Sequence, residues 1–199
     1  LKIFIGIQEE GAAGFTFRAA PQGEQRLPDE LVQIYREFTA AIGPAVRKGG
    51  DREDHSQGHA LNQNPELRKA QEAAIAQLKA SASVVQDVLR SSGSASDRGA
   101  AAWLLGYAPD KKAIAAELVA AARDPDSTVR NNATRALGAV AKLAAAQPAL
   151  GIVIEPDVFV DMLRSVTWTD RNKVSFLLDG MTALGIVIEP DVFVDMLRS

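Results

Sequence analysis

The sequence contains no cysteine, only 6% aromatic residues and only two histidines. Without cysteine the chain can form no disulfide, no thiolate metal site and no thiol nucleophile. No apolar run approaches the roughly 20 residues that a membrane-spanning helix needs, so we expect no membrane span. A strongly basic balance is also missing, since the formal net charge is -3 and the pI is near 5.5. This charge argues against a nucleic-acid partner.

What remains is the composition of an ordinary globular protein. Hydrophobic residues make up 47% of the 199 residues and charged residues 24%, which is enough to bury a core within one domain and a small appendage. The chain begins at Leu1 rather than at methionine, which indicates a processed or trimmed chain. We therefore expect a periplasmic or secreted protein whose leader has been removed, with a cytoplasmic protein as the alternative.

The first segment, residues 1–26, differs from the rest of the chain. Two short runs rich in β-branched and aromatic residues, Ile3–Ile7 and Phe15–Arg18, flank a connection that contains glycine. This pattern predicts a small β-hairpin. A two-stranded hairpin is marginal alone, so it must pack against the remainder of the protein.

The second segment, residues 27–96, has the periodicity of helices. A first helix is predicted to open at Pro28 and Asp29 and to be interrupted or kinked at Gly43-Pro44. Its apolar stripe consists of Leu31, Ile34, Tyr35, Phe38 and Ile42.

A polar loop is predicted for residues 47–64, and a second helix follows it. Asn64 before Pro65 is typical of a helix start, because asparagine caps the first turn and proline fits its first position. We expect this helix to end near Arg90, with Ile75, Leu78, Val85 and Leu89 facing inward.

The third segment, residues 97–199, contains an internal repeat. Three stretches align on an arginine, and each places a leucine seven residues later; the pairs are Arg98 with Leu105, Arg130 with Leu137, and Arg171 with Leu178. Second amphipathic helices lie between these stretches, in "DKKAIAAELVAAARD" and "PDVFVDMLRS". Because a lone helix pair cannot bury its apolar face, such pairs are expected to stack into a solenoid.

The stretch "LLGYAPDKKAIAAELVAAARDPDSTVRNNATRALGAVA" resembles HEAT repeats, specifically the short bacterial kind also found in phycobilin lyases. Its most specific part is "DPDSTVRNNATRALG", Asp124–Gly138. Together with "EDHSQGHAL" and "WTDRNKVSF" it is similar to an uncharacterised group of bacterial HEAT-repeat proteins. The resemblance implies repeats that serve as protein-binding scaffolds. The fold class expected is therefore mainly α, a short HEAT-like α-solenoid of stacked helix pairs with a small N-terminal β-hairpin.

The stretch 149–165 reappears letter for letter at 183–199, an offset of 34 residues (149 to 183). Three explanations stay open: a very recent duplication, an engineered repeat, and a sequence assigned by copying. We expect each copy to form a second helix, the first packed against the helix 170–182. The second copy would leave part of its apolar face uncovered, which predicts self-association into a homo-oligomer through Val192, Phe193, Met196 and Leu197.

The two histidines form the first candidate site. His55 and His59, with Asp54 nearby, have the i, i+4 spacing that can present two imidazoles to one metal ion on a helix. Gly58 and the polar surroundings favour a loop instead. The two interpretations are a weak metal site and a solvated polar loop.

The repeated arginines and the tryptophans form the second candidate site. Arg98, Arg130 and Arg171 are either a basic ladder that grips an acidic partner or a structural ladder. In the structural ladder, aspartates bridge repeats or cap helix starts; these are Asp97, Asp126 and Asp170. Trp103 and Trp168 either pack between repeats or, where exposed on a concave face, anchor a partner. Asn131-Asn132 is either polar glue between helices or a surface contact.

These patterns favour a non-enzymatic protein-interaction scaffold whose partner is another protein of unknown identity, and no cofactor is expected. The alternative is a metal-dependent or lyase-type enzyme that uses the His55/His59 loop. The His-Glu dipeptides of HEAT-like iron hydroxylases are absent from the sequence, as are a glycine-rich phosphate loop and a Gly-x-Ser-x-Gly elbow.

Overall fold

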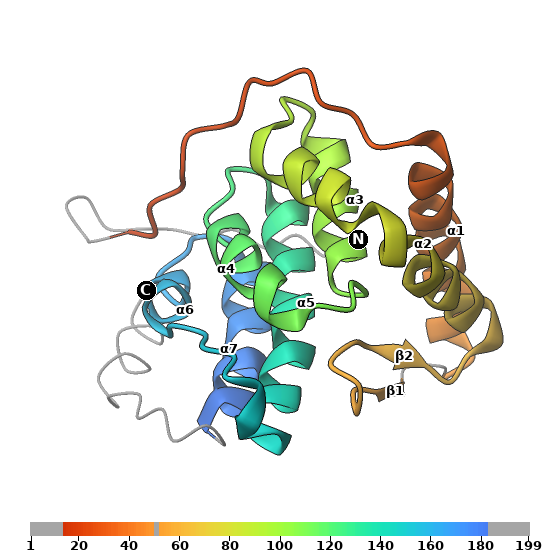
Figure 1. The fold of residues 1–199 in the computed structure, drawn as a ribbon. Coiled ribbons are helices and arrows are strands. Elements are labelled where there is room, and N and C mark those ends of the chain that lie inside the picture. Colours follow the sequence, from red (N-terminus) through yellow and green to blue (C-terminus); the bar gives the residue numbers. More distant parts are fainter. Residues whose placement is uncertain (1–13, 50–51, 183–199) are drawn as a thin grey trace.

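The computed structural model of the protein describes residues 14–49 and 52–182 (Figure 1). The described residues form a mainly helical fold with one small antiparallel hairpin, which confirms the fold class predicted from the sequence. In chain order the elements are α1 (Asp29–Arg47), β1 (Glu53–Asp54), β2 (Leu61–Asn62), α2 (Pro65–Ser91), α3 (Ala95–Leu105), α4 (Lys111–Ala121), α5 (Ser127–Ala146), the 3-10 helix η1 (Pro148–Leu150), α6 (Asp157–Met162) and α7 (Trp168–Thr182). None of these described helices combines the length and apolar character needed to cross a bilayer.

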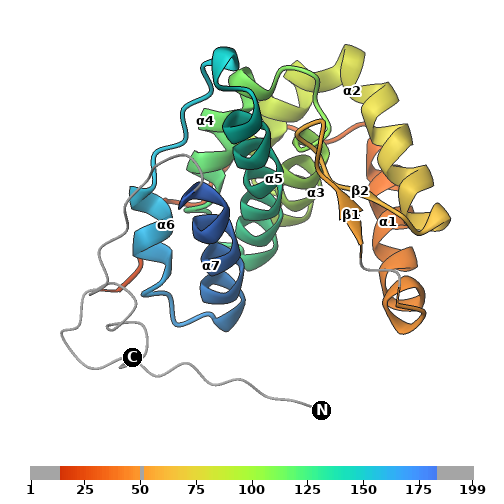
Figure 2. The ribbon, with the colours of Figure 1, turned by 90° about the horizontal axis from the view of Figure 1, so that it is seen from below.

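The helices are arranged as stacked neighbours. Helices α3, α5 and α7 contact one another in sequence, with α4 and α6 on one side and α1 and α2 on the other (Figure 2). The three repeat leucines are fully buried along this central row; they are Leu105, Leu137 and Leu178. The repeat pattern therefore identified the core face correctly, because each leucine lies one turn beyond the small residues that let neighbouring helices approach.

Side chains that the sequence marks as caps begin several helices. The Asn64 carboxamide oxygen accepts hydrogen bonds from the backbone N–H groups of Glu66 and Leu67 at the start of α2. Asp126 does the same at the start of α5 for Thr128 and Val129. Such caps satisfy N–H groups that have no partner within the helix.

Helix α1 runs through Gly43-Pro44 and ends only at Arg47, so the expected interruption does not end the helix. Ala45 lies one residue beyond the proline, within the helix, and is 2% exposed. Ile42, expected in the apolar stripe, is 38% exposed.

The hairpin lies elsewhere than the sequence predicted. Residues 15–18 form no strand, and Ile3–Ile7 lie outside the described residues. The strands pair Glu53 with Asn62 and Asp54 with Leu61, inside the segment expected to be a polar loop.

Two features fold that segment onto the helices. Gly58 adopts a φ of 72° and sits so close to α5 that an added Cβ would lie 2.6 Å from the Leu143 side chain, so only glycine fits there. The backbone N–H of Asn62 donates to Gln71 on α2 at 2.7 Å.

Residues 14–28 form an extended strap that crosses from the α4 and α6 side to α1 (Figure 1). Its backbone is tied down at two points, by the N–H of Arg18 on the Arg123 carbonyl at 2.7 Å and by an isolated bridge between Gly23 and Ser92. Its aromatic ring Phe17 lies 4.5 Å below the guanidinium of Arg130. The strap therefore packs against Arg130 instead of pairing as a strand.

The first copy of the duplicated stretch forms η1 and α6. Val158, Phe159, Met162 and Leu163 are buried there, and α6 packs against α7, as predicted. The second copy lies outside the described residues, so self-association through Val192, Phe193, Met196 and Leu197 stays a prediction.

Candidate functional site

Two of the three repeat arginines lie inside the protein and hold carboxylates there. Arg98 and Arg130 are each 2% exposed. Arg98 pairs with Asp124 and Arg130 with Asp170, with N–O distances of 2.7 to 3.0 Å. The carboxylate therefore comes from the following repeat, and neither guanidinium lines an open groove. This geometry corresponds to the structural ladder among the two interpretations. The carboxylate that pairs with Arg98 is Asp124 and not Asp97.

Arg171 shares one feature with the other two arginines. Each of the three donates through Nη1 to the carbonyl oxygen of the residue six positions earlier, which is Ser92, Asp124 or Ser165. These contacts hold the loop before each repeat helix against its first turn. Arg171 is only partly buried, and no carboxylate among the described residues lies within ion-pair distance of it.

The two tryptophans occupy different environments. Trp103 is 3% exposed and packs against Phe38 and Tyr107, with ring centroids 4.5 and 4.7 Å away. It is therefore a core residue that joins α1 to α3. Trp168, at the start of α7, is 44% exposed, as a binding anchor must be.

His55 and His59 are not part of a metal cluster in the described residues. Across residues 14–49 and 52–182, no three histidine or acidic side chains come close enough together to hold a metal ion. The Nε2 atom of His55 lies 3.8 Å from Glu53, whereas the Asp54 carboxylate accepts from the backbone of Ser56.

His59 is buried rather than solvated, which corrects the expectation of a solvated loop at this position. It is 8% exposed and its ring lies 5.9 Å from that of Tyr107. Neither of its nitrogens makes a hydrogen bond within the described residues. Burial, assisted by the charge of Lys111, lowers the pKa of His59 to about 4.

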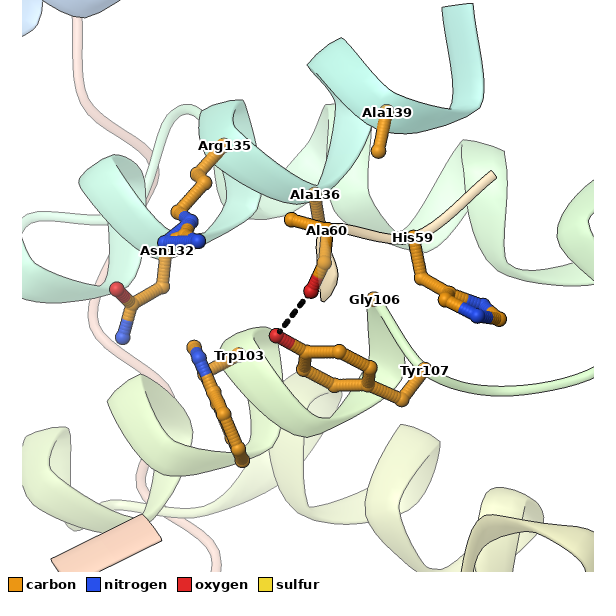
Figure 3. Close-up of a pocket in the computed structure, with 9 residues that line it drawn as sticks. All are labelled: His59, Ala60, Trp103, Gly106, Tyr107, Asn132, Arg135, Ala136 and Ala139. Carbon is orange, nitrogen blue, oxygen red and sulfur yellow. Dashed lines mark hydrogen bonds between the residues drawn. The ribbon is translucent and has the colours of Figure 1, made fainter. Parts of the chain in front are cut away.

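A small cavity lies beside these rings (Figure 3). The Tyr107 hydroxyl donates to the carbonyl of Ala60 at 3.2 Å, and the ring separates Trp103 from His59 in this view. The cavity measures about 10 Å³, roughly the space of one water molecule. This cavity is too small for a substrate or cofactor. The residues that line it join the hairpin segment to α3 and α5.

A larger groove opens between α5 and α7. It measures about 190 Å³. The hairpin residue His55 also contributes to its wall. Leu177 and Ala139 form a buried apolar part of its lining, whereas Phe176 is 70% exposed at its edge.

Positive charge surrounds this groove. Arg135, Lys142 and Lys173 line it, and the only carboxylate among the described residues that pairs with any of them is Glu53, which binds Arg135. Partial burial, together with the charge of Arg135, lowers the pKa of Lys173. Burial and the charge of Lys142 likewise lower the pKa of His55, so this imidazole is neutral at pH 7 and the charge comes from the other three groups.

Sequence reasoning missed this groove. Arg135, Lys142 and Lys173 belong to two different repeats, and the chain gives no sign that they converge. One local signal was present: Lys142 follows Arg135 by seven residues, which places both on the same face of a helix.

A second hollow, of about 460 Å³, lies between α1 and α2. Its charged side chains are two glutamates and two lysines, Glu37, Glu66, Lys48 and Lys69. With no excess of either sign and mostly alanine between, this hollow shows no chemical preference.

Comparison with known proteins locates the repeats. No curated protein and no solved structure matches the chain. Residues 82–166 match the family described as HEAT repeats, and this stretch extends from the second half of α2 past the end of α6. Within this stretch the chain is similar to HEAT repeats, the family that the sequence indicated.

Proposed function

We propose that the protein is a non-enzymatic protein-interaction scaffold built on its HEAT repeats. The observation that carries this proposal is the exposure of Phe176, 70% of which faces solvent beside the open groove between α5 and α7. A large aromatic side chain left exposed next to a hollow is typical of a surface that a partner covers.

The exposed apolar side chains are also concentrated toward the end of the described chain. Five of the nine large hydrophobic side chains that the described chain exposes lie between Leu150 and Phe176. Scattered exposure is normal on any protein surface, but concentration in one part of the chain favours an interface.

Site-specific photocrosslinking in the native source tests this proposal. A photoreactive phenylalanine analogue replaces Phe176 in one variant and Val84 in a matched control, because Val84 is also exposed, at 44%, but lies on α2. We expect position 176 to crosslink a reproducible protein partner that position 84 does not. Equal crosslinking at both positions, or none at 176, would contradict the proposal.

A further inference from the structure

The helix that forms one wall of the groove has a glycine where its fold needs none. Gly138 lies in the interior of α5, a helix of 20 residues, and glycine is among the weakest helix formers. A Cβ atom built at this position meets nothing within 4 Å, and its φ is not positive. Neither close packing nor backbone conformation among the described residues explains the glycine, which instead leaves open space on the groove wall.

The size of the groove limits what can occupy it. Pockets for small-molecule ligands usually measure roughly 300–1,000 Å³, whereas this groove measures about 190 Å³. It suits a single inserted side chain better than a whole ligand. The wall at Gly138 and Ala139 is apolar, and the exposed Phe176 ring at the edge is available for contact with an apolar side chain.

The charges at the rim determine the chemistry of what surrounds that side chain. Arg135 is held in place by Glu53 and lies over the ring of Phe38, 5.7 Å from its centroid. Lys142 and Lys173 have no carboxylate within ion-pair distance among the described residues. The groove is thus a positive area on a chain whose net charge is -3, which favours carboxylates in the partner.

We infer that the groove between α5 and α7 binds an acidic segment of a partner protein. One apolar side chain of that segment lies over Gly138 beside Phe176, and neighbouring carboxylates pair with Lys142 and Lys173. This inference rests on the proposed scaffold function and specifies the partner that the site accepts.

Fluorescence anisotropy on the full chain tests the inference with a defined probe. The probe is a fluorescein-labelled peptide in which one phenylalanine is flanked on both sides by glutamates. Two matched peptides serve as references, one with glutamine in place of each glutamate and one with serine in place of the phenylalanine. We expect the acidic phenylalanine peptide to bind about tenfold more tightly than either reference, and its affinity to fall with added salt.

Two variants of the groove have matched controls elsewhere. Gly138→Leu places a side chain in the open space, where an added Cβ meets nothing within 4 Å. Its control is Gly43→Leu, a helical glycine in α1 whose added Cβ would meet only the Arg47 side chain at 3.5 Å. Lys142→Glu reverses one rim charge, and its control is Lys79→Glu on the exposed face of α2. Each groove variant should bind the probe about tenfold more weakly, and each control should bind like the wild type.

Circular dichroism and thermal unfolding of all four variants separate loss of binding from loss of fold. Wild-type affinity in Gly138→Leu or Lys142→Glu, or equal affinity for the acidic and glutamine peptides, would overturn the inference. Tighter binding of a single-stranded oligonucleotide than of the peptide would also overturn it in favour of a phosphate-binding surface. The two proposals can fail separately. If a native partner crosslinks at position 176 but the peptide probe does not bind, the scaffold proposal stands and the inference of an acidic segment is wrong.

Discussion

The guanidinium of Arg98 clasps the carboxylate of Asp124 between α3 and the start of α5, with Nε–Oδ2 and Nη2–Oδ1 distances of 2.9 Å each. Burial of Asp124 would raise the pKa of its carboxyl, but hydrogen bonds from Arg98, Arg18 and the backbone of Asp126 outweigh burial and lower it. The carboxylate is therefore charged at pH 7 and compensates two arginines that approach it.

Removal of this charge should destabilise the protein strongly. In Asp124→Asn the side chain keeps its shape, but Arg98 is left as an uncompensated charge at 2% exposure. Removing one partner of a buried ion pair lowers the free energy of unfolding by about 3–5 kcal/mol. Urea denaturation at pH 7 would measure this loss.

The control for this change is the more exposed pair that Asp97 forms, one residue before Arg98 in the first turn of α3. Arg26, 69% exposed, contacts Asp97 at 3.2 Å, and surface pairs of this kind contribute about 1 kcal/mol or less. We therefore expect Asp97→Asn to cost far less than Asp124→Asn. Equal losses would show that the buried ladder has no special role in stability.

The leucine at the centre of the best-conforming repeat should also be sensitive. Leu137 is fully buried in α5, and truncation to alanine removes buried methyl groups and leaves a cavity. The expected cost of Leu137→Ala is about 2–5 kcal/mol, against roughly 0.5 kcal/mol or less for Lys142→Ala on the exposed face of the same helix. An unchanged urea midpoint for Leu137→Ala would mean that the core does not depend on this position.

Local features of the fold could be predicted from sequence because they depend on neighbouring residues. Caps such as Asn64 and the inward leucines follow from spacing of three to four residues along one helix. The hairpin could not be placed, because its position depends on Gly58 meeting Leu143 on α5 and on Asn62 bonding Gln71. Contacts between distant parts of the chain leave no periodic trace in a single sequence.

The candidate site likewise combines features that the sequence predicts with contacts that only the fold reveals. The three arginines were found by alignment, but their interpretation required knowing that Asp124 and Asp170 come from the following repeat. The groove residues Arg135 and Lys173 lie on different helices, and only the packing of α5 against α7 brings them together.

Burial of His59 makes stability depend on pH in a specific window. Its pKa is lowered from 6.5 to about 4, so the unfolded chain binds a proton below pH 6.5 that the folded chain does not. The contribution of the neutral imidazole is therefore complete above pH 6.5 and falls as the pH drops toward 4, by roughly 3 kcal/mol in total. Urea denaturation across this range should show the loss, and His59→Gln should reduce it.

His55 provides the comparison, since it lies on the same hairpin. Burial lowers the pKa of His55 too, so His55→Gln removes a second titrating imidazole without touching His59. The His55→Gln variant should keep most of the pH dependence. If His59→Gln and the wild type lose the same stability between pH 6.5 and 4, the His59 imidazole is not buried in solution.

The last prediction concerns Asn132, which joins three helices through a single side-chain amide. Its Nδ2 donates to the Tyr35 hydroxyl on α1 at 3.0 Å and to the Gly99 carbonyl on α3 at 2.9 Å, and the residue is 8% exposed on α5. Of the two interpretations of Asn131-Asn132, a polar link between helices therefore applies to Asn132.

Replacement of Asn132 by alanine should remove the side-chain donor from the Gly99 carbonyl, which lies inside α3 and keeps the N–H donor of its own helix. A typical hydrogen bond contributes about 0.5–1.5 kcal/mol, so Asn132→Ala should lower the free energy of unfolding by about that amount for each bond lost, measured by urea denaturation. Asn131→Ala, one residue earlier and only partly buried, is the matched control and should change little. Because Tyr35 shares the same amide, Tyr35→Phe combined with Asn132→Ala should cost less than the two single changes together. Additive losses would mean that the hydrogen bond between α1 and α5 contributes nothing to the stability of the stack.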